Sequence, residues 1–284
     1  MTTIFNDADG SQASQEATEP IQADHAPVSP PLRLFDRVLC GIDGSGASFE
    51  AVRQAHRLAP AESRFVLFGV ADIVSLPAGW PEPYGSALDE IEDGIRQAVH
   101  TAAQYAPGRT PKEIVIDGAP LEITHELLET EKPSLLVVGA KRRSRTVGVA
   151  LASVATELVH VPRCPVLLGR LRARQVGGFP QSISVGVDGS PPSLRALEAA
   201  HEIGARLGCS VTALTVGATG DRDEAPERLG VPVVRLDGDP SEVLGRSVAD
   251  LVVVGSAGKS GVHALGSVSE RVAHHARASV LVIP

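Results

Sequence analysis

The sequence repeats itself, and this repeat constrains the fold more than any other feature. Residues 38–48 (VLCGIDGSGAS) match residues 183–193 (ISVGVDGSPPS) at an offset of 145 positions. The offset falls to 116 for LLVVG at 135–139 and LVVVG at 251–255, so the second copy lacks 29 residues between these two landmarks. The chain is therefore expected to contain two copies of one structural unit, the second shortened.

Within the first copy, short apolar runs alternate with segments of helical periodicity. The strand-like runs are 37–42, 65–70, 113–117, 135–139 and 165–168, and the helix-like segments are 49–59, 86–105, 121–130 and 154–160. Strands that alternate with helices predict βαβ units and a parallel sheet, which is an α/β fold. The second copy lacks the counterpart of the long helix at 86–105, because only residues 217–230 separate Val216 from Val231. We expect the N-terminal tail, a second chain or residues 217–230 to cover the exposed sheet face.

Composition divides the chain into four parts. Residues 1–33 are polar, acidic and rich in proline, which predicts a disordered tail. The first unit is expected at 34–170 and the second at 182–284, joined by a basic, glycine-containing linker at 171–181.

Charge and cysteine content exclude several classes of protein. The net charge of −8 argues against a general nucleic-acid binder. No apolar run reaches the roughly 18–20 residues that span a bilayer, and no secretory signal is visible at the N-terminus. The three cysteines form no CxxC pair, which is typical of a reducing compartment and argues against a cysteine zinc site. A cytoplasmic protein without membrane contact is expected.

The first strand of each unit ends at an Asp-Gly-Ser sequence, Asp43 to Ser45 and Asp188 to Ser190. Ligands of parallel sheets bind beyond the carboxyl ends of the strands, where a carboxylate can accept hydrogen bonds from an amine or a sugar hydroxyl. The same residue types also cap helices. Capping is favoured for Ser190, because prolines follow it, whereas for Asp188 both interpretations remain open.

The fourth strand of the second unit is followed by GSAGKSG at 255–261 and GSVSE at 266–270. Glycines allow backbone N–H groups to approach phosphate oxygens, and a helix that starts near Ser267 adds the positive end of its dipole. Ser267 and Glu270 also fit a capping box, which is compatible with an anion site. The glycines are not a P-loop, because only two residues separate Gly255 from Gly258-Lys259, and no GxGxxG is present.

These motifs together resemble the universal stress protein family. Paired D-x-S strand exits, then G-x-x-G, a spacer and G-S before a helix, follow the family pattern over 36–170 and 182–284. The resemblance implies two tandem flavodoxin-like (Rossmann-like) parallel-sheet units with strand order 3-2-1-4-5. In the family, last strands pair between protomers, so we expect either a homodimer or pairing of the two units within the chain.

The resemblance also implies an ATP site in the second unit, with magnesium on the triphosphate. Asp188 would lie near the adenosine, and Val216 would offer backbone groups to adenine. Gly255, Ala257 and Gly258 would line the ribose and first phosphates, and Gly266, Ser267, Val268 and Ser269 would hold the outer phosphates. The spacer between the two glycine motifs has seven residues, where the family usually has nine, so a tighter phosphate loop is expected.

The first unit departs from the family pattern. It keeps Asp43 and Gly139, but Arg142 replaces the second glycine and Ala152 replaces the third. A Cβ and a guanidinium enter space that glycine leaves open for phosphate, so this unit is expected to be degenerate and mainly structural. As an alternative, Arg142 and its neighbouring arginines could bind an anion through their side chains.

No catalytic residue and no metal ligand stands out in the sequence. The expected function is therefore that of an ATP-binding regulatory or stress-response protein that presents different surfaces to an unknown protein partner. Two alternatives remain: a slow ATP-hydrolysing enzyme on the same fold, and a nucleotide-free interaction scaffold. The intact glycines of the second unit argue against the scaffold.

Overall fold

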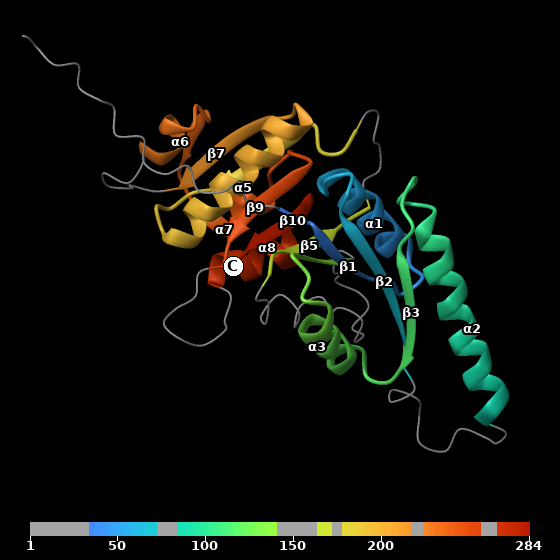
Figure 1. Cartoon of the computed structure of the whole chain (residues 1–284). Helices are drawn as coiled ribbons and strands as arrows, with labels where there is room; N and C mark the ends of the chain where they lie inside the picture. The colour runs from blue at the N-terminus through green and yellow to red at the C-terminus, as the bar shows by residue number, and fades with distance from the viewer. Residues whose placement is uncertain (1–33, 73–83, 141–163, 172–177, 217–223, 257–265) are drawn as a thin grey trace, which may run out of the picture. The chain divides into compact units, whose positions relative to one another are not determined.

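The computed structural model describes residues 34–72, 84–140, 164–171, 178–216, 224–256 and 266–284. The strands of the N-terminal half are β1 (Arg37–Gly41), β2 (Arg64–Ala71), β3 (Lys112–Asp117), β4 (Leu135–Gly139) and β5 (Val166–Gly169). Those of the C-terminal half are β6 (Ser182–Gly186), β7 (Ser210–Val216), β8 (Val233–Leu236), β9 (Leu251–Gly255) and β10 (Ser279–Ile283). All of them belong to a single sheet (Figure 1).

The sheet has the strand order β3-β2-β1-β4-β5-β10-β9-β6-β7-β8. Within each half the order is 3-2-1-4-5 and the neighbours are parallel, as predicted. The two halves meet at β5 and β10, which pair antiparallel with Leu167 opposite Leu281. Of the two expected pairings of last strands, the structure shows the one within the chain.

The helices cover both faces of this sheet. One face carries α1 (Gly46–Leu58), α2 (Tyr84–Ala103), α5 (Pro191–Leu207) and α6 (Glu224–Arg228). The other carries α3 (Pro120–Glu131), α7 (Pro240–Gly245) and α8 (Ser267–His275). Figure 1 shows α2 and α3 on opposite sides of β3. The helix predicted at 154–160 lies outside the described residues.

The strands β4 and β9 are apolar along their whole length because helices cover both of their sides. Four residues in succession are buried in β4 and again in β9. Alternate side chains belong to opposite faces, so Leu135 and Val137 pack beneath α1 while Leu136 and Val138 face the other layer. No helix in the described ranges is long and apolar enough to cross a membrane.

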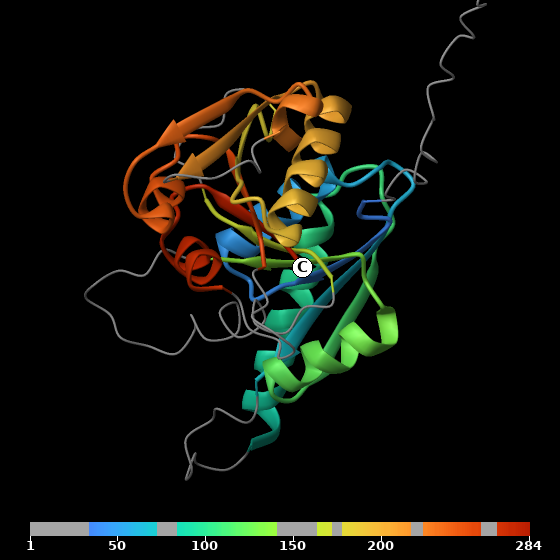
Figure 2. The ribbon, with the colours of Figure 1, turned by 90° about the vertical axis from the view of Figure 1, so that its left-hand side faces the viewer.

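The second half is turned toward the viewer in Figure 2, and two of its covering helices are shorter than their counterparts in the first half. Where α2 has 20 residues, α6 has five, and the segment from Ala225 through Leu229 to Val231 packs on the apolar cluster beneath it. Of the three covers expected for this face, part of the 217–230 segment therefore takes the role. On the opposite face α7 has six residues where α3 has 12, and Val234 and Leu236 of β8 stay 41% and 39% exposed.

The predicted linker is held in place near both of its ends by buried residues. Phe179 lies within 171–181 but is fully buried in the core. Arg170, directly before this segment, is buried and donates hydrogen bonds to the carbonyls of Ala278 (2.9 Å) and Ala273. The backbone N–H of Arg170 also donates to Ser279 Oγ at 3.0 Å. This end of the linker is therefore fixed to the strand that closes the second half.

Candidate functional site

A cavity of about 340 Å³ opens at the carboxyl ends of β6, β7 and β9, beside the N-terminus of α8. Seven of the predicted nucleotide-site residues line it: Asp188, Val216, Gly255, Gly266, Ser267, Val268 and Ser269. The other two, Ala257 and Gly258, lie outside the described residues. Residues separated by up to 81 positions along the sequence are therefore brought to one cavity, as expected of a site at the strand exits.

Asp188 follows β6 and is held by the turn that it begins. Its Oδ1 accepts a hydrogen bond from the backbone N–H of Ser190 at 2.9 Å. Partial desolvation alone would raise the pKa of this carboxyl, but the hydrogen bonds from Ser190 and Ser193 outweigh it and lower the pKa. Asp188 is therefore an ionised acceptor at the edge of the cavity at neutral pH.

Ser190 caps α5, as the prolines after it predicted. Its hydroxyl accepts from the backbone N–H of Ser193 at 3.4 Å, and Pro191 occupies the first turn. The first half repeats this arrangement: Asp43 accepts from the N–H of Ser45 at 2.9 Å, and Ser45 caps α1. The two interpretations of the Asp-Gly-Ser turn are thus compatible, because Asp188 shapes the turn and also lines the cavity.

Gly255, at the end of β9, allows α5 to approach the sheet closely. A Cβ at this position would lie 2.6 Å from the backbone nitrogen of Ser193 and closer still to Pro192. Gly139, its counterpart at the end of β4, would place a Cβ 2.7 Å from the carbonyl carbon of Ala47. Helix packing alone therefore requires this glycine in both halves, whether or not a ligand binds.

The N-terminus of α8 differs from the predicted capping box. The N-cap residue is Gly266, not Ser267, and Gly266 has no side chain to cap the first turn. Ser269 instead donates its hydroxyl to the carbonyl of Gly255 at 2.6 Å, which ties α8 to the end of β9. The capping box of Ser267 and Glu270 is wrong, and the first turn of α8 faces the cavity without a side-chain cap from its N-cap residue.

The sequence analysis missed several apolar lining residues, among them Leu214, Pro240 and Leu244. Leu214 lies two residues before Val216 on β7 and so faces the same side of the sheet. Pro240 and Leu244 come from α7, whose first turn is capped by Asp239 through the N–H groups of residues 241 and 242. The sequence did contain a signal, because Asp-Pro is a typical helix start.

Comparison with known proteins identifies the family. The sequence model of the universal stress protein family matches residues 34–170 and 220–284. The chain belongs to the universal stress protein family. A universal stress protein of Mycobacterium tuberculosis is 30% identical over 291 residues, covering 86% of this chain and 95% of that protein. One of Mycolicibacterium smegmatis is 31% identical over 290 residues, covering 87% and 96%.

Solved structures agree with this fold. The crystal structure of a universal stress protein from Archaeoglobus fulgidus superposes with a TM-score of 0.67 at 21% identity, covering 87% of this chain and 98% of that one. A putative universal stress protein from Pseudomonas aeruginosa gives a TM-score of 0.58 at 16% identity, with coverages of 88% and 94%. At these identities the likeness concerns the fold.

Arg142 and Ala152, on which the predicted degeneracy of the first unit rests, lie outside the described residues, so that interpretation remains a prediction. The cysteines Cys40 and Cys164 are buried and unpaired, and burial raises the pKa of both thiols, to about 11 for Cys164. Such thiols are protonated and unreactive at neutral pH.

Proposed function

We propose that this tandem universal stress protein binds ATP, carried with Mg²⁺, in the cavity bounded by β6, β7, β9 and α8. The observation that supports this most strongly is the convergence of seven predicted nucleotide-site residues on one cavity of about 340 Å³. This volume lies within the range typical of small-molecule sites. The protein would act as a cytoplasmic regulatory or stress-response factor rather than as an enzyme.

The inner part of the cavity suits an adenosine. Leu214, Val216 and Leu244 provide apolar surface for a purine ring, and the backbone of Val216, at the end of β7, provides polar groups for its edge. Asp188 is ionised and partly exposed, so its carboxylate can accept hydrogen bonds from ribose hydroxyls or an amino group.

The outer part suits phosphate groups. The first turn of α8 presents backbone N–H groups and the positive end of the helix dipole, and Gly266 leaves the approach to it clear of a side chain. Among the described residues no cluster of three or more His, Cys, Asp or Glu could hold a metal. Mg²⁺ would therefore be held mainly by the phosphate oxygens, whose charge it would partly neutralise.

Regulation would follow because a nucleotide binds one arrangement of the site more tightly than another. A nucleotide that contacts the strand exits and the first turn of α8 favours the arrangement of these segments that it binds best. The surface offered to a protein partner would then depend on nucleotide occupancy, which requires no chemical step.

Titration calorimetry with ATP and Mg²⁺ tests the proposal. We expect one site per chain, lost in Gly266→Arg because a guanidinium would occupy the approach to α8. Asp188→Ala should weaken binding by about tenfold or more, the effect of removing a charged hydrogen-bond acceptor. The matched variant Asp43→Ala, which alters the same turn in the first half, should bind ATP like the wild type.

Three outcomes would contradict the proposal. No binding to the wild-type chain would favour the nucleotide-free scaffold. Binding lost in Asp43→Ala but kept in Gly266→Arg would place the nucleotide in the first unit. Phosphate release that turns over and disappears in Asp188→Ala, measured on the same samples, would favour the slow ATP-hydrolysing enzyme.

A further inference from the structure

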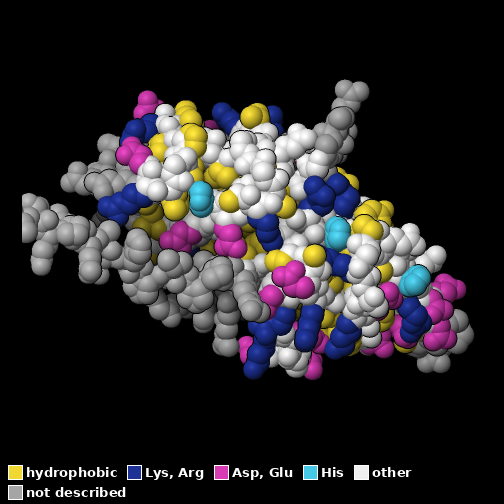
Figure 3. Space-filling view, turned by 45° about the horizontal axis from the view of Figure 1, so that its top comes forward, with side chains coloured by type: hydrophobic (Ala, Val, Ile, Leu, Met, Phe, Trp, Pro, Cys, Tyr) yellow, Lys and Arg dark blue, Asp and Glu magenta, His cyan; other side chains and the backbone are white. Residues whose placement is uncertain are grey.

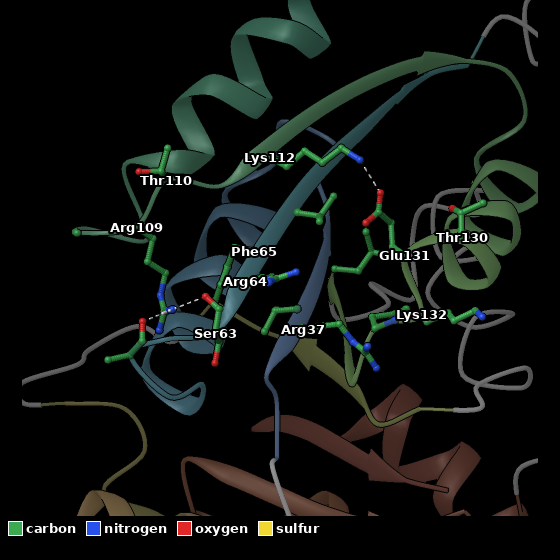
Figure 4. Close-up of a pocket in the computed structure, with 16 residues that line it drawn as sticks. Arg37, Ser63, Arg64, Phe65, Arg109, Thr110, Lys112, Thr130, Glu131 and Lys132 are labelled. Carbon is green, nitrogen blue, oxygen red and sulfur yellow. Dashed lines mark hydrogen bonds and ion pairs between the residues drawn. The ribbon is translucent and has the colours of Figure 1, made fainter.

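A second and larger cavity, of about 720 Å³, lies in the N-terminal half at the amino ends of the strands (Figure 4). Its walls come from the starts of β1 and β2, the segment between α2 and β3, and the last residues of α3. None of the seven described residues predicted for the nucleotide site lines it. On the sheet, β1 and β6 are five strands apart, so the two cavities belong to different halves.

The lining of this cavity is strongly basic, although the chain as a whole is acidic. Among the described residues, the ionisable ones that line it are Arg37, Arg64, Arg109, Lys112, Lys132 and Glu131. Five positive charges therefore face one negative charge, in a protein with a net charge of −8. Figure 3 shows that Lys and Arg side chains also gather side by side along the lower margin of the face that it presents. A local field of this sign attracts anions.

Two of the five cations already have partners within the protein. Arg109 donates to the carbonyls of Pro60 (2.7 Å), Ser63 (2.9 Å) and Ala61 (3.0 Å), and its guanidinium stacks over Phe65. These carbonyls belong to the turn that follows α1, so the guanidinium of Arg109 is committed to this turn.

Lys112 contacts Glu131, the one carboxylate among the described lining residues, at 2.7 Å. Figure 4 draws this pair at one side of the cavity. Glu131 is thus paired with Lys112, so its carboxylate does not compensate the positive charge of the other lining side chains.

Arg37 and Arg64 form the central feature of the cavity. They are register partners on the neighbouring strands β1 and β2, so their side chains leave the same face of the sheet next to each other. Both side chains are exposed, and among the described residues neither forms an ion pair. Lys132, directly after the end of α3, also lines the cavity, and Figure 4 draws its side chain extending away from the two arginines. Like charges placed opposite each other repel, and an anion between them removes that repulsion.

We propose that this cavity is a second binding site, for a small phosphate-bearing anion with two or more negative charges. Arg37 and Arg64 donate to its oxygen atoms, and Lys132 adds to the positive field of the cavity from the end of α3. Guanidinium groups bind phosphate oxygens with paired, charge-assisted hydrogen bonds, which makes the two arginines the main determinants of affinity.

Titration calorimetry with inorganic pyrophosphate, without magnesium and at low salt, tests this site. The wild-type chain is expected to bind pyrophosphate, and the double variant Arg37→Gln/Arg64→Gln to lose one site or to bind at least tenfold more weakly. Arg277→Gln removes an exposed arginine outside the cavity and should leave binding unchanged. Arg64→Lys keeps the charge and should retain part of the affinity.

Thermal unfolding separates loss of binding from loss of folding. Without an anion, the double variant should unfold at the same temperature as the wild type or higher, because a repulsive pair has been removed. Pyrophosphate should then raise the midpoint of the wild type and of Arg277→Gln but not that of the double variant. Absence of pyrophosphate binding to the wild type, or equal affinity and stoichiometry in the double variant, would overturn the proposal. Equal losses in the double variant and Arg277→Gln would reveal non-specific attraction, which also overturns it.

Discussion

At the scale of single residues, the glycine that ends β9 is required for helix packing whether or not a ligand binds. Gly255 and Gly139 occupy the same place in the two halves, and each accommodates the backbone of the helix that covers it. A glycine motif that looks like a phosphate loop in the sequence can therefore owe one of its glycines to helix–sheet contact. Gly266 differs, because it begins α8 at the edge of the cavity.

Gly255→Ala should destabilise the fold. The added methyl group would overlap backbone atoms of Pro192 and Ser193, which cannot rotate away. We expect the free energy of unfolding, from urea denaturation, to fall by about 1–3 kcal/mol. Gly94→Ala is the matched control: Gly94 lies within α2 with nothing within 4 Å of its Cβ position, and the change should stabilise the protein by about 0.5–1 kcal/mol. Equal effects of the two changes would contradict the packing argument.

Asp188 should make stability depend on pH. Its pKa is lower in the folded protein than in the unfolded chain, so its stabilising effect is present above the unfolded pKa and is lost as the pH falls through the folded pKa. Asp188→Asn keeps the shape but not the charge. The variant should be less stable than the wild type at neutral pH, and the difference should vanish in acid. Denaturation curves recorded across this range measure it; a constant difference would show that the charge is not the cause.

Seven of the nine residues predicted for a nucleotide site line one cavity, because strand exits in a parallel sheet must meet at one edge. The prediction failed at the N-terminus of α8, where two residues in succession are suitable N-caps. Ser267 and Glu270 fit a capping box, but glycine is also a good N-cap, and Gly266 takes that position. Leu244 was missed because a helix of six residues is too short to show helical periodicity.

At the scale of elements, the strands of the central sheet were predictable because they are apolar on both faces. β8 was not, since its four residues are mostly exposed and include Arg235. The two short helices α6 and α7 follow from the shortened second copy. Their lengths could be inferred from the missing residues, but the side of the sheet that each covers depends on contacts distant in sequence.

Loss of the cap on α5 should weaken the second half. Ser190→Ala removes the hydroxyl that accepts from the N–H of Ser193, and we expect the free energy of unfolding to fall by about 1 kcal/mol. Ser190→Asp preserves a capping oxygen and should recover most of this loss. Urea denaturation measures both; an alanine variant as stable as the wild type would show that water replaces the hydroxyl.

At the scale of the whole molecule, β5 and β10 join the halves into one sheet, and Arg170 reinforces the join. Its guanidinium, from the end of the first half, binds the carbonyls of Ala273 and Ala278 in the second. Arg170→Met keeps the apolar stem but leaves these buried carbonyls without their donor. We expect a loss of about 3 kcal/mol. Arg277→Gln, at an exposed arginine next to Ala278, should change stability by less than about 0.5 kcal/mol.

Differential scanning calorimetry tests whether the two halves unfold together. The wild type should unfold in one transition whose calorimetric and van 't Hoff enthalpies agree, because the sheet is continuous. In Arg170→Met the transition should move to lower temperature. A wild-type chain that melts in two separate steps would show that the halves unfold independently.

The antiparallel join of β5 to β10 also has a consequence for mass action. Two separate units that met through these strands would dissociate on dilution, whereas here both strands lie on one polypeptide and their effective concentration does not depend on how much protein is present. Each half therefore always has its neighbour. One half is then free to accumulate substitutions that abolish a ligand site while it continues to support the other.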